Sequence, residues 1–231
     1  MKKIVGIMGG MGPLATVDLM SKIIHLTPAK SDQDHIHMIV DNYPQIPDRT
    51  SAIFGKGASP LPSMIESANR LEAAGADMIA IACNTAHYYR NDIQASVNIP
   101  ILDMPKEAVR FIENKGLKSM ALLATDGTLS TNLYQESLRE QGIAVVEPDK
   151  MTQDRIMEGI YAVKSGDLDE GKKLLLQAAK IVLDQGAEAI LAACTEIPLV
   201  LSELDGIRVI DPTEILAKTI VDRCLVPTFL E

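Results

Sequence analysis

One short stretch of the chain occurs twice, and this repeat constrains the fold more than any other feature. Gly75–Cys83 matches Gly186–Cys194 at a constant offset, with identical Gly, Ala, Ile, Ala and Cys and an acidic residue third in each copy. Threonine follows closely, as Thr85 and Thr195. A short apolar run between a glycine and a polar turn is typical of a buried parallel strand. The repeat therefore predicts two related half-molecules, in each of which a cysteine ends a strand.

Strand ends are where open α/β sheets build their sites, so the two cysteines are candidates for chemistry. Facing half-molecules would place Cys83 and Cys194 on opposite sides of one ligand, as an acid and a base on the two faces of a carbon. The alternative is that duplication copied a small buried hydrophobic residue. The residues that follow each cysteine resemble helix starts, which we expect to lower the thiol pKa and to bind a carboxylate. Cys224 lacks this context and is interpreted as structural.

Composition excludes several classes of partner. A net charge of −9 argues against nucleic acid and anionic membranes, and the absence of Trp argues against base stacking. Three cysteines suggest reduced thiols and a cytoplasmic setting. No apolar run reaches the ~18 residues of a membrane span, and Gly9–Pro13 interrupts the first run too early for a signal peptide. We expect a cytoplasmic protein with a small-molecule substrate; a homodimer remains an open alternative.

Strand-like runs alternate with helical patterns along the whole chain, which favours an α/β fold. We expect two pseudo-symmetric domains, each a parallel sheet flanked by helices, with the active site in the cleft between them. In a second repeat, Ile99–Asp103 resembles Ile207–Asp211. From it we expect the two domains to comprise residues 1–104 and 105–212. The final helix, over 213–231, is expected to pack back on the first domain.

The individual elements follow from periodicity and from Gly and Pro stops. The expected strands are Lys3–Met8, His35–Asp41, Met78–Cys83, Ile99–Asp103, Ser119–Ala124, Ala144–Glu147, Ala189–Cys194 and Ile207–Asp211. The expected helices are Pro13–Leu26, Pro60–Ala74, Pro105–Lys115, Ser130–Gln141, Asp154–Lys164, Asp169–Gln185 and Pro212–Cys224.

A glycine loop follows the first strand. Gly10–Ala15 fits G-x-G-x-x-A, the weak form of the dinucleotide fingerprint, and Asp41 could take the ribose role. The simpler interpretation is that the glycines let the loop turn tightly and let a ligand approach the backbone. We favour the simpler one.

Two cations and a histidine complete the candidates. Arg49, in a proline-stiffened segment, can hold a carboxylate with two parallel hydrogen bonds. Taken alone, Arg49 is a solvated loop residue and Lys164 a lysine at a helix end. Cys83 and His87 have i, i+4 spacing, but C-x-x-C and H-E-x-x-H are absent. We expect no metal site and interpret His87 as a packing residue.

Taken together, these segments resemble the cofactor-independent aspartate racemases of the aspartate/glutamate racemase family. The matching segments span nearly the whole chain in order: Gly9–Pro13, Ile46–Arg49, Cys83–His87, Leu123–Thr128, Ile160–Tyr161 with Lys164, and Cys194–Leu199.

The resemblance implies a site between two domains that works without pyridoxal phosphate or another cofactor. It implies that Cys83 and Cys194 are the acid/base pair and that Arg49 and Lys164 bind carboxylates. It further implies a substrate-binding set that comprises Met11, Gly12, Asn84, Thr85, Thr128, Thr195 and Glu196. This chain departs from the family at Ala193, where the family has Gly, and the added methyl is expected to narrow that side of the site.

The chemistry agrees with this resemblance. Removal of an α-proton creates a carbanion, which oriented donors and cations must stabilise in a dry cleft. One cysteine takes the proton as thiolate while the other donates one from the opposite face. We therefore expect a racemase that interconverts L- and D-aspartate. Glutamate or broad aspartate/glutamate racemisation, a non-catalytic two-lobed amino-acid binding protein and an NAD-dependent oxidoreductase are the alternatives.

Overall fold

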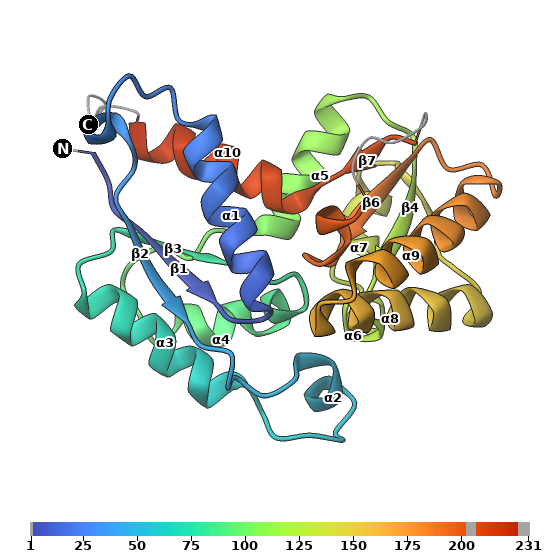
Figure 1. Cartoon of the computed structure of the whole chain (residues 1–231), viewed down its shortest axis with the longest axis horizontal. Coiled ribbons are helices and arrows are strands. Elements are labelled where there is room, and N and C mark those ends of the chain that lie inside the picture. The colour runs from blue at the N-terminus through green and yellow to red at the C-terminus, as the bar shows by residue number, and fades with distance from the viewer. Residues whose placement is uncertain (1, 202–206, 226–231) are drawn as a thin grey trace.

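The computed structural model describes residues 2–201 and 207–225, and it contains two parallel β-sheets that lie in separate halves of the molecule (Figure 1). The first sheet has the order β2-β1-β3 and is formed by Val5–Gly9 (β1), Met38–Asn42 (β2) and Met78–Ile81 (β3). The second has the order β5-β4-β6-β7 and is formed by Ser119–Ala124 (β4), Ala144–Val146 (β5), Ala189–Ala193 (β6) and Val209–Ile210 (β7).

The two sheets share one plan. In each, the first strand of the half lies in the middle, and every pairing is parallel. The repeated segments form β3 and β6, which hold equivalent places beside β1 and β4. The repeat also begins alike, because Gly75 and Gly186 have φ of 94° and 95°. Only glycine adopts this left-handed conformation without strain, which explains the glycine that starts each copy.

Helices cover both faces of each sheet. Their bounds are Pro13–Leu26 (α1), Arg49–Ile53 (α2), Leu61–Ala73 (α3), Arg90–Gln94 (α4), Met104–Asn114 (α5), Asp126–Ser130 (α6), Gln135–Glu140 (α7), Lys150–Ser165 (α8), Leu168–Leu183 (α9) and Pro212–Leu225 (α10). Short 3₁₀ helices span Asp32–Asp34, Thr85–Tyr89 and Ile197–Leu199.

Successive side chains of a strand point to opposite faces of the sheet, so each strand contributes to two separate hydrophobic cores. Val5 and Ile7 of β1 pack with Leu19 of α1 and Ile220 of α10, whereas Met8 packs with the helices on the other face. The α10 helix therefore comes from the end of the described chain and covers the first sheet beside α1 (Figure 1). The division at residue 104 remains a prediction, and residues 226–231 of the expected final helix lie outside the described part.

Two expected elements differ from the structure. The helix expected over Ser130–Gln141 begins only at Gln135, as α7, because Ser130 ends α6 and residues 131–134 form a turn. In that turn Asn132 takes a positive φ of 52°, which asparagine tolerates better than most residues. The strand expected over Ile99–Asp103 is reduced to one bridge between Ile101 and Ile79. Proline within that segment has no N–H to donate, so a full ladder cannot form there.

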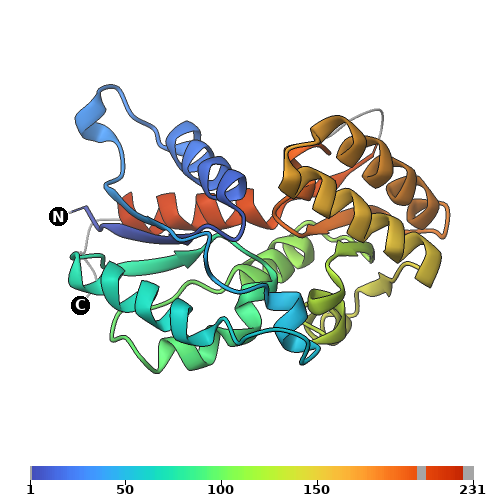
Figure 2. The same cartoon turned by 60° about the horizontal axis from the view of Figure 1, so that its bottom comes forward.

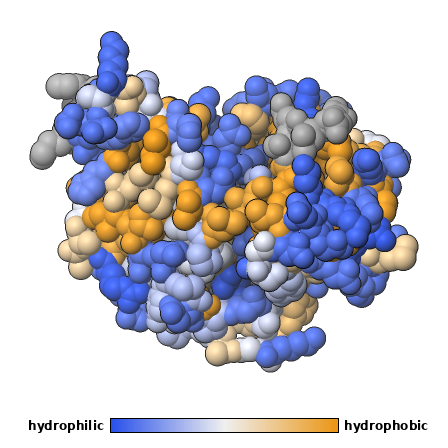
Figure 3. Space-filling view, viewed as in Figure 1, coloured by the Kyte–Doolittle hydropathy of each residue, from blue (hydrophilic) through white to orange (hydrophobic). Residues whose placement is uncertain are grey.

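The outer face that carries α1 and α10 has apolar side chains interspersed with polar ones (Figure 3). Leu14, Val17 and Ile24 of α1 are exposed. In the described part of the chain, no helix has both the length and the apolar character needed to cross a membrane.

The two halves meet where α2 of the first half packs on α6 of the second (Figure 2). A Cβ atom placed on Gly127 of α6 would lie 2.9 Å from Thr50 Oγ1 and 3.0 Å from Thr85 Cγ2. Thr85 also spans the junction, since its hydroxyl lies 2.8 Å from that of Thr125 and 2.9 Å from that of Thr128. The approach of the halves therefore depends on the missing side chain of Gly127.

We expect Gly127→Ala to destabilise the protein by about 1–3 kcal/mol, because the new methyl overpacks the contact between α2 and α6. The midpoint of urea unfolding, followed by far-UV circular dichroism, measures the effect. Ser130→Ala on the same helix is the control, since Ser130 is exposed, and it should leave the midpoint nearly unchanged. Equal midpoints for Gly127→Ala and wild type would show that the close approach is not needed.

Candidate active site

A small cavity lies between the two halves at the carboxyl ends of the strands, and both repeated cysteines line it. Its volume is about 20 Å³, close to the space that one water molecule needs. The residues that line it are Met11, Asp48, Arg49, Thr50, Cys83, Asn84, Thr85, Thr125, Ile160, Tyr161, Lys164, Cys194, Thr195 and Glu196. The structure therefore brings the two thiols to one enclosed place from two different sheets.

The cysteine of the first half is held through its backbone. Cys83 follows β3, and its carbonyl oxygen accepts a hydrogen bond of 2.8 Å from His87 Nδ1. The other ring nitrogen, His87 Nε2, accepts from the backbone N–H of Met104 at 3.3 Å. Burial lowers the pKa of His87, which favours the neutral ring that this pair of bonds requires. The Cys–His spacing noted in the sequence thus fastens the loop after β3 to the start of α5.

The cysteine of the second half has a carboxylate beside it. The Cys194 thiol donates to Glu196 Oε2 at 3.0 Å. Burial raises the pKa of Cys194 well above its usual value, and the charge of Glu196 raises it further, against the opposing effect of Lys164. The expected lowering of the thiol pKa by a helix start is therefore wrong for Cys194. The turn that follows is only the 3₁₀ helix Ile197–Leu199, and Glu196 before it supplies a negative charge.

Glu196 connects the two halves. It is 3% exposed, and its Oε1 accepts from Lys164 Nζ at 2.7 Å and from the backbone N–H of Gly12 at 3.2 Å. Burial alone lowers the pKa of Lys164, but Glu196, Cys194 and Cys83 together raise it above its usual value. Lys164 therefore stays cationic and already has an acidic partner.

Arg49, in contrast, has no acidic partner among the described residues. Its guanidinium donates to the backbone carbonyls of Ile46, Pro47 and Met11, at 3.3, 3.1 and 3.3 Å. The residue is 8% exposed, and its Nε atom has no hydrogen-bond partner. A buried cation is costly unless it is paired, so this position favours a bound anion.

Asn84 and Thr85 follow Cys83 and do not act as the capping residues that their position suggested. Asn84 makes no side-chain cap bond. Its Oδ1 accepts a hydrogen bond from the hydroxyl of Tyr134, and its buried Nδ2 has no partner in the part of the chain that the structure describes. Thr195, at the equivalent place after Cys194, donates to Glu196 Oε2 at 3.3 Å. Thr128 lies behind the residues that line the cavity, and its hydroxyl forms hydrogen bonds with those of Thr85 and Thr125.

The sequence-predicted residues thus fall into two groups. Cavity-lining members are Cys83, Cys194, Met11, Arg49, Asn84, Thr85, Lys164, Thr195 and Glu196. Gly12 and Thr128 contact this lining from behind. The sequence did not identify five further cavity-lining residues as parts of the site, namely Asp48, Thr50, Thr125, Ile160 and Tyr161. It also missed Tyr134, which contacts the lining residue Asn84. Thr125 directly follows β4, so the strand-end rule applied to the middle strand would have found it, whereas no sequence signal marked Tyr134.

No contact of the glycine loop supports a dinucleotide. The backbone N–H of Gly12, which would face a pyrophosphate, donates to Glu196, and Asp41 pairs with Arg70 at 2.8 Å. Among residues 2–201 and 207–225, no three His, Cys, Asp or Glu side chains gather as a metal-binding group.

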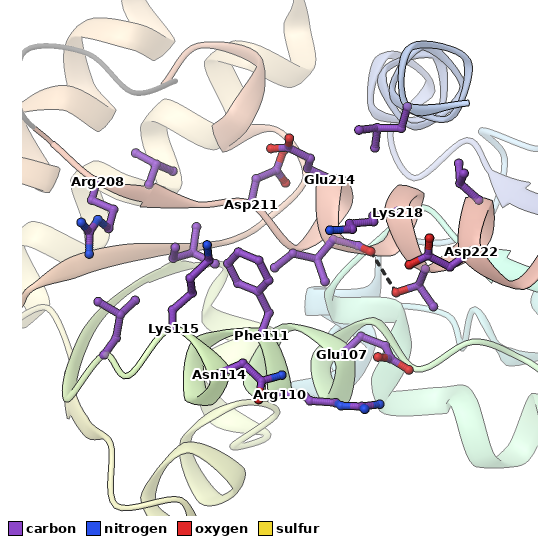
Figure 4. Close-up of a pocket in the computed structure, with 17 residues that line it drawn as sticks. Glu107, Arg110, Phe111, Asn114, Lys115, Arg208, Asp211, Glu214, Lys218 and Asp222 are labelled. Carbon is purple, nitrogen blue, oxygen red and sulfur yellow. Dashed lines mark hydrogen bonds between the residues drawn. The ribbon is translucent and has the colours of Figure 1, made fainter. Parts of the chain in front are cut away.

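A larger groove of about 960 Å³ lies elsewhere, between α5, α10 and β7 (Figure 4). Its labelled side chains carry both charges, with Glu107, Asp211, Glu214 and Asp222 against Arg110, Lys115, Arg208 and Lys218. It contains neither repeated cysteine nor any of the other predicted site residues. Its size alone therefore does not make it the reactive site.

Known proteins resemble this chain over nearly all of its length. A family model described as Asp/Glu/Hydantoin racemase matches residues 8–220. The broad specificity amino-acid racemase RacX of Bacillus subtilis is 31% identical, over 96% of this chain and 98% of that protein. Picrophilus torridus aspartate racemase has a similar structure, with a TM-score of 0.88, 36% identity, and coverage of 95% of this chain and 93% of that one. An aspartate racemase homologue from Pyrococcus horikoshii OT3 gives a TM-score of 0.74 at 27% identity, with coverage of 96% and 98%.

We expect Glu196→Gln to move the pH midpoint of Cys194 alkylation to lower pH. The amide removes a negative charge beside the thiol while the Lys164 cation remains, so the pKa of Cys194 falls. Iodoacetamide labelling of the Cys194 peptide, followed by mass spectrometry across a pH series, gives the midpoint. Glu188→Gln is the control, because Glu188 lies at the opposite end of β6 and accepts from Lys118 N. An unchanged midpoint in Glu196→Gln would contradict the electrostatic role of Glu196.

Proposed function

The chain belongs to the Asp/Glu/hydantoin racemase family, and on that premise we propose that it interconverts L- and D-aspartate by moving the α-proton between Cys83 and Cys194. The observation that carries the proposal is that one enclosed cavity holds both thiols together with a buried guanidinium, Arg49, that has no acidic partner within residues 2–201 and 207–225. The thiols supply the proton transfer and the cation selects an anionic substrate.

The proton transfer needs one thiolate and one thiol. Because the Cys194 thiol donates to Glu196, we assign Cys194 as the acid and Cys83 as the base for one direction of the reaction. The Sγ of Cys83 takes the α-proton, and the electron pair of that C–H bond remains on the α-carbon. Cys194 then gives its proton to the opposite face, which inverts the configuration. The enzyme is left with a Cys83 thiol and a Cys194 thiolate, the state that accepts the other enantiomer.

Cations in the cavity stabilise the charge that moves during this reaction. Lys164 faces Glu196 and is near enough to both thiols for their charges to raise its pKa, so it offsets a thiolate at either position. Arg49 can bind a side-chain carboxylate with its planar donors. Preorganised charges of this kind lower the barrier because they need no rearrangement as charge develops.

The substrate is proposed as aspartate because Arg49, which no described acidic residue neutralises, can bind one side-chain carboxylate in a small site. The similarity to Picrophilus torridus aspartate racemase supports this choice. The present cavity has room for about one water molecule, so the walls must move apart before an amino acid enters.

A broad substrate range is the second candidate, and the similarity to the broad specificity racemase RacX favours it. Incubation with L-aspartate in deuterated water, without added pyridoxal phosphate or metal, tests the proposal. We expect loss of the α-proton NMR signal and appearance of D-aspartate. Binding without exchange would instead support a non-catalytic binding protein, and faster exchange of other amino acids would support the broad range.

We expect Cys83→Ala and Cys194→Ala each to lower racemisation about 10²–10⁴-fold, because each thiol is needed for one of the two proton steps. Chiral chromatography of the aspartate product measures the rate. Cys224→Ala is the matched control, since Cys224 is equally buried but belongs to α10, in the core between that helix, α1 and the first sheet, where burial raises its pKa to about 11. It should keep its activity. Either site variant with a tenth or more of the wild-type rate would rule out the two-cysteine mechanism.

We expect Arg49→Lys to lower kcat/KM for aspartate about tenfold or more although the charge is kept, because the planar pair of donors is lost. Lys164→Ala should also impair turnover, since it leaves Glu196 without its cation. Arg70→Lys is the control, as Arg70 is exposed and pairs with Asp41 away from the cavity. Turnover of alanine or serine by the Arg49 variant would identify this cation as the source of specificity. Values within about twofold of wild type would remove the carboxylate role from both residues.

A further inference from the structure

Tyr134 is a buried residue of the second half that touches the site without lining its cavity. It immediately precedes α7, is 0% exposed and packs in the core formed by α5, α7 and the second sheet. Its hydroxyl crosses the junction and donates a short hydrogen bond to Asn84 Oδ1 in the first half. Neither the motif matches nor the strand-end rule singled it out.

The bond fixes which end of the Asn84 amide faces the cavity. Asn84 is 2% exposed and lines the cavity, and its Nδ2 has no hydrogen-bond partner among the described residues. We propose that Tyr134 is a positioning residue, which holds Asn84 so that its NH₂ group is presented to a carboxylate oxygen of the substrate. This inference rests on the proposed racemase function.

The phenol is suited to this task because it can keep its proton. Burial raises the pKa of Tyr134 well above its usual value, and nearby acidic groups and thiols raise it further. A protonated phenol that donates to Asn84 leaves the amide oxygen occupied. If the amide turned over, its oxygen would face the substrate and the Tyr134 proton would lose its acceptor. The observed bond therefore disfavours the turned amide.

The orientation matters more as the reaction proceeds. When the α-proton leaves, negative charge spreads from the α-carbon to the adjoining carboxylate. A donor that already points at that carboxylate stabilises the charge, whereas an amide oxygen in the same place repels it. Because Asn84 and Tyr134 come from different halves, the donor is oriented only when the halves are together. The contact thus couples assembly of the site to its readiness for proton removal.

Tyr134→Phe removes the hydroxyl while the ring keeps its packing, so the proposal predicts a loss of activity with little change in the fold. We expect kcat/KM for aspartate to fall about tenfold or more, in line with the cost of an unsatisfied buried acceptor. Asn84→Ala should cause a loss at least as large. In the double variant, Tyr134→Phe should add less than about twofold, because residues that act through each other are non-additive. Tyr88→Phe, at an exposed tyrosine, is the control and should match wild type.

A second measurement does not depend on activity. The side-chain NH₂ signals of Asn84, assigned by their loss in Asn84→Ala, should be a sharp pair in the wild type and broadened in Tyr134→Phe. Independent, multiplying losses in the double variant, or sharp unchanged signals in Tyr134→Phe, would overturn the positioning role. If the wild-type protein moves no α-proton, the proposed function fails, while the NH₂ signals still decide the role of Tyr134.

Discussion

The carboxylate of Glu196 is the interaction on which the site depends. It is buried, and it takes hydrogen bonds from the Cys194 thiol, from Lys164 and from the backbone of Gly12 in the other half. A buried charge is tolerated only when its partners satisfy it, so Glu196 requires the glycine loop and α8 to be in place together. The carboxylate of Glu196 thus connects the two halves, accepts the proton of the Cys194 thiol in a hydrogen bond and balances the positive charge of Lys164.

The arrangement also divides the work between the two cations. Lys164 balances the charge of Glu196, whereas Arg49 is held by backbone carbonyls and its Nε has no partner among the described residues. Only the second is available to an external anion without breaking an ion pair. Both residues were expected to bind carboxylates, and the structure separates them because a lysine is the mobile point charge that reaches Glu196, while the arginine is enclosed by its own loop.

The junction of the halves is polar and closely packed. The Thr85 hydroxyl forms hydrogen bonds with those of Thr125 and Thr128 across it. Tyr134 donates a hydrogen bond to Asn84, and Thr50 of α2 packs against Gly127. These contacts are short and directional, so a small displacement breaks several of them at once. The orientation of the donors in the site therefore depends on how closely the two halves pack.

The sequence by itself determined the family, the α/β fold with two parallel sheets, and the pair of cysteines at equivalent strand ends. These features are local: a buried strand, a left-handed glycine and the residues after a strand each depend on residues that are neighbours in the sequence. The tertiary structure alone decided that Cys194 has a raised pKa, that Lys164 is paired and that Tyr134 holds Asn84. Each of these depends on side chains from segments far apart in the chain, and the field at a buried atom is set by what surrounds it in space. Periodicity also missed the turn at Asn132, which ends before Tyr134, the residue whose hydroxyl reaches Asn84 in the other half.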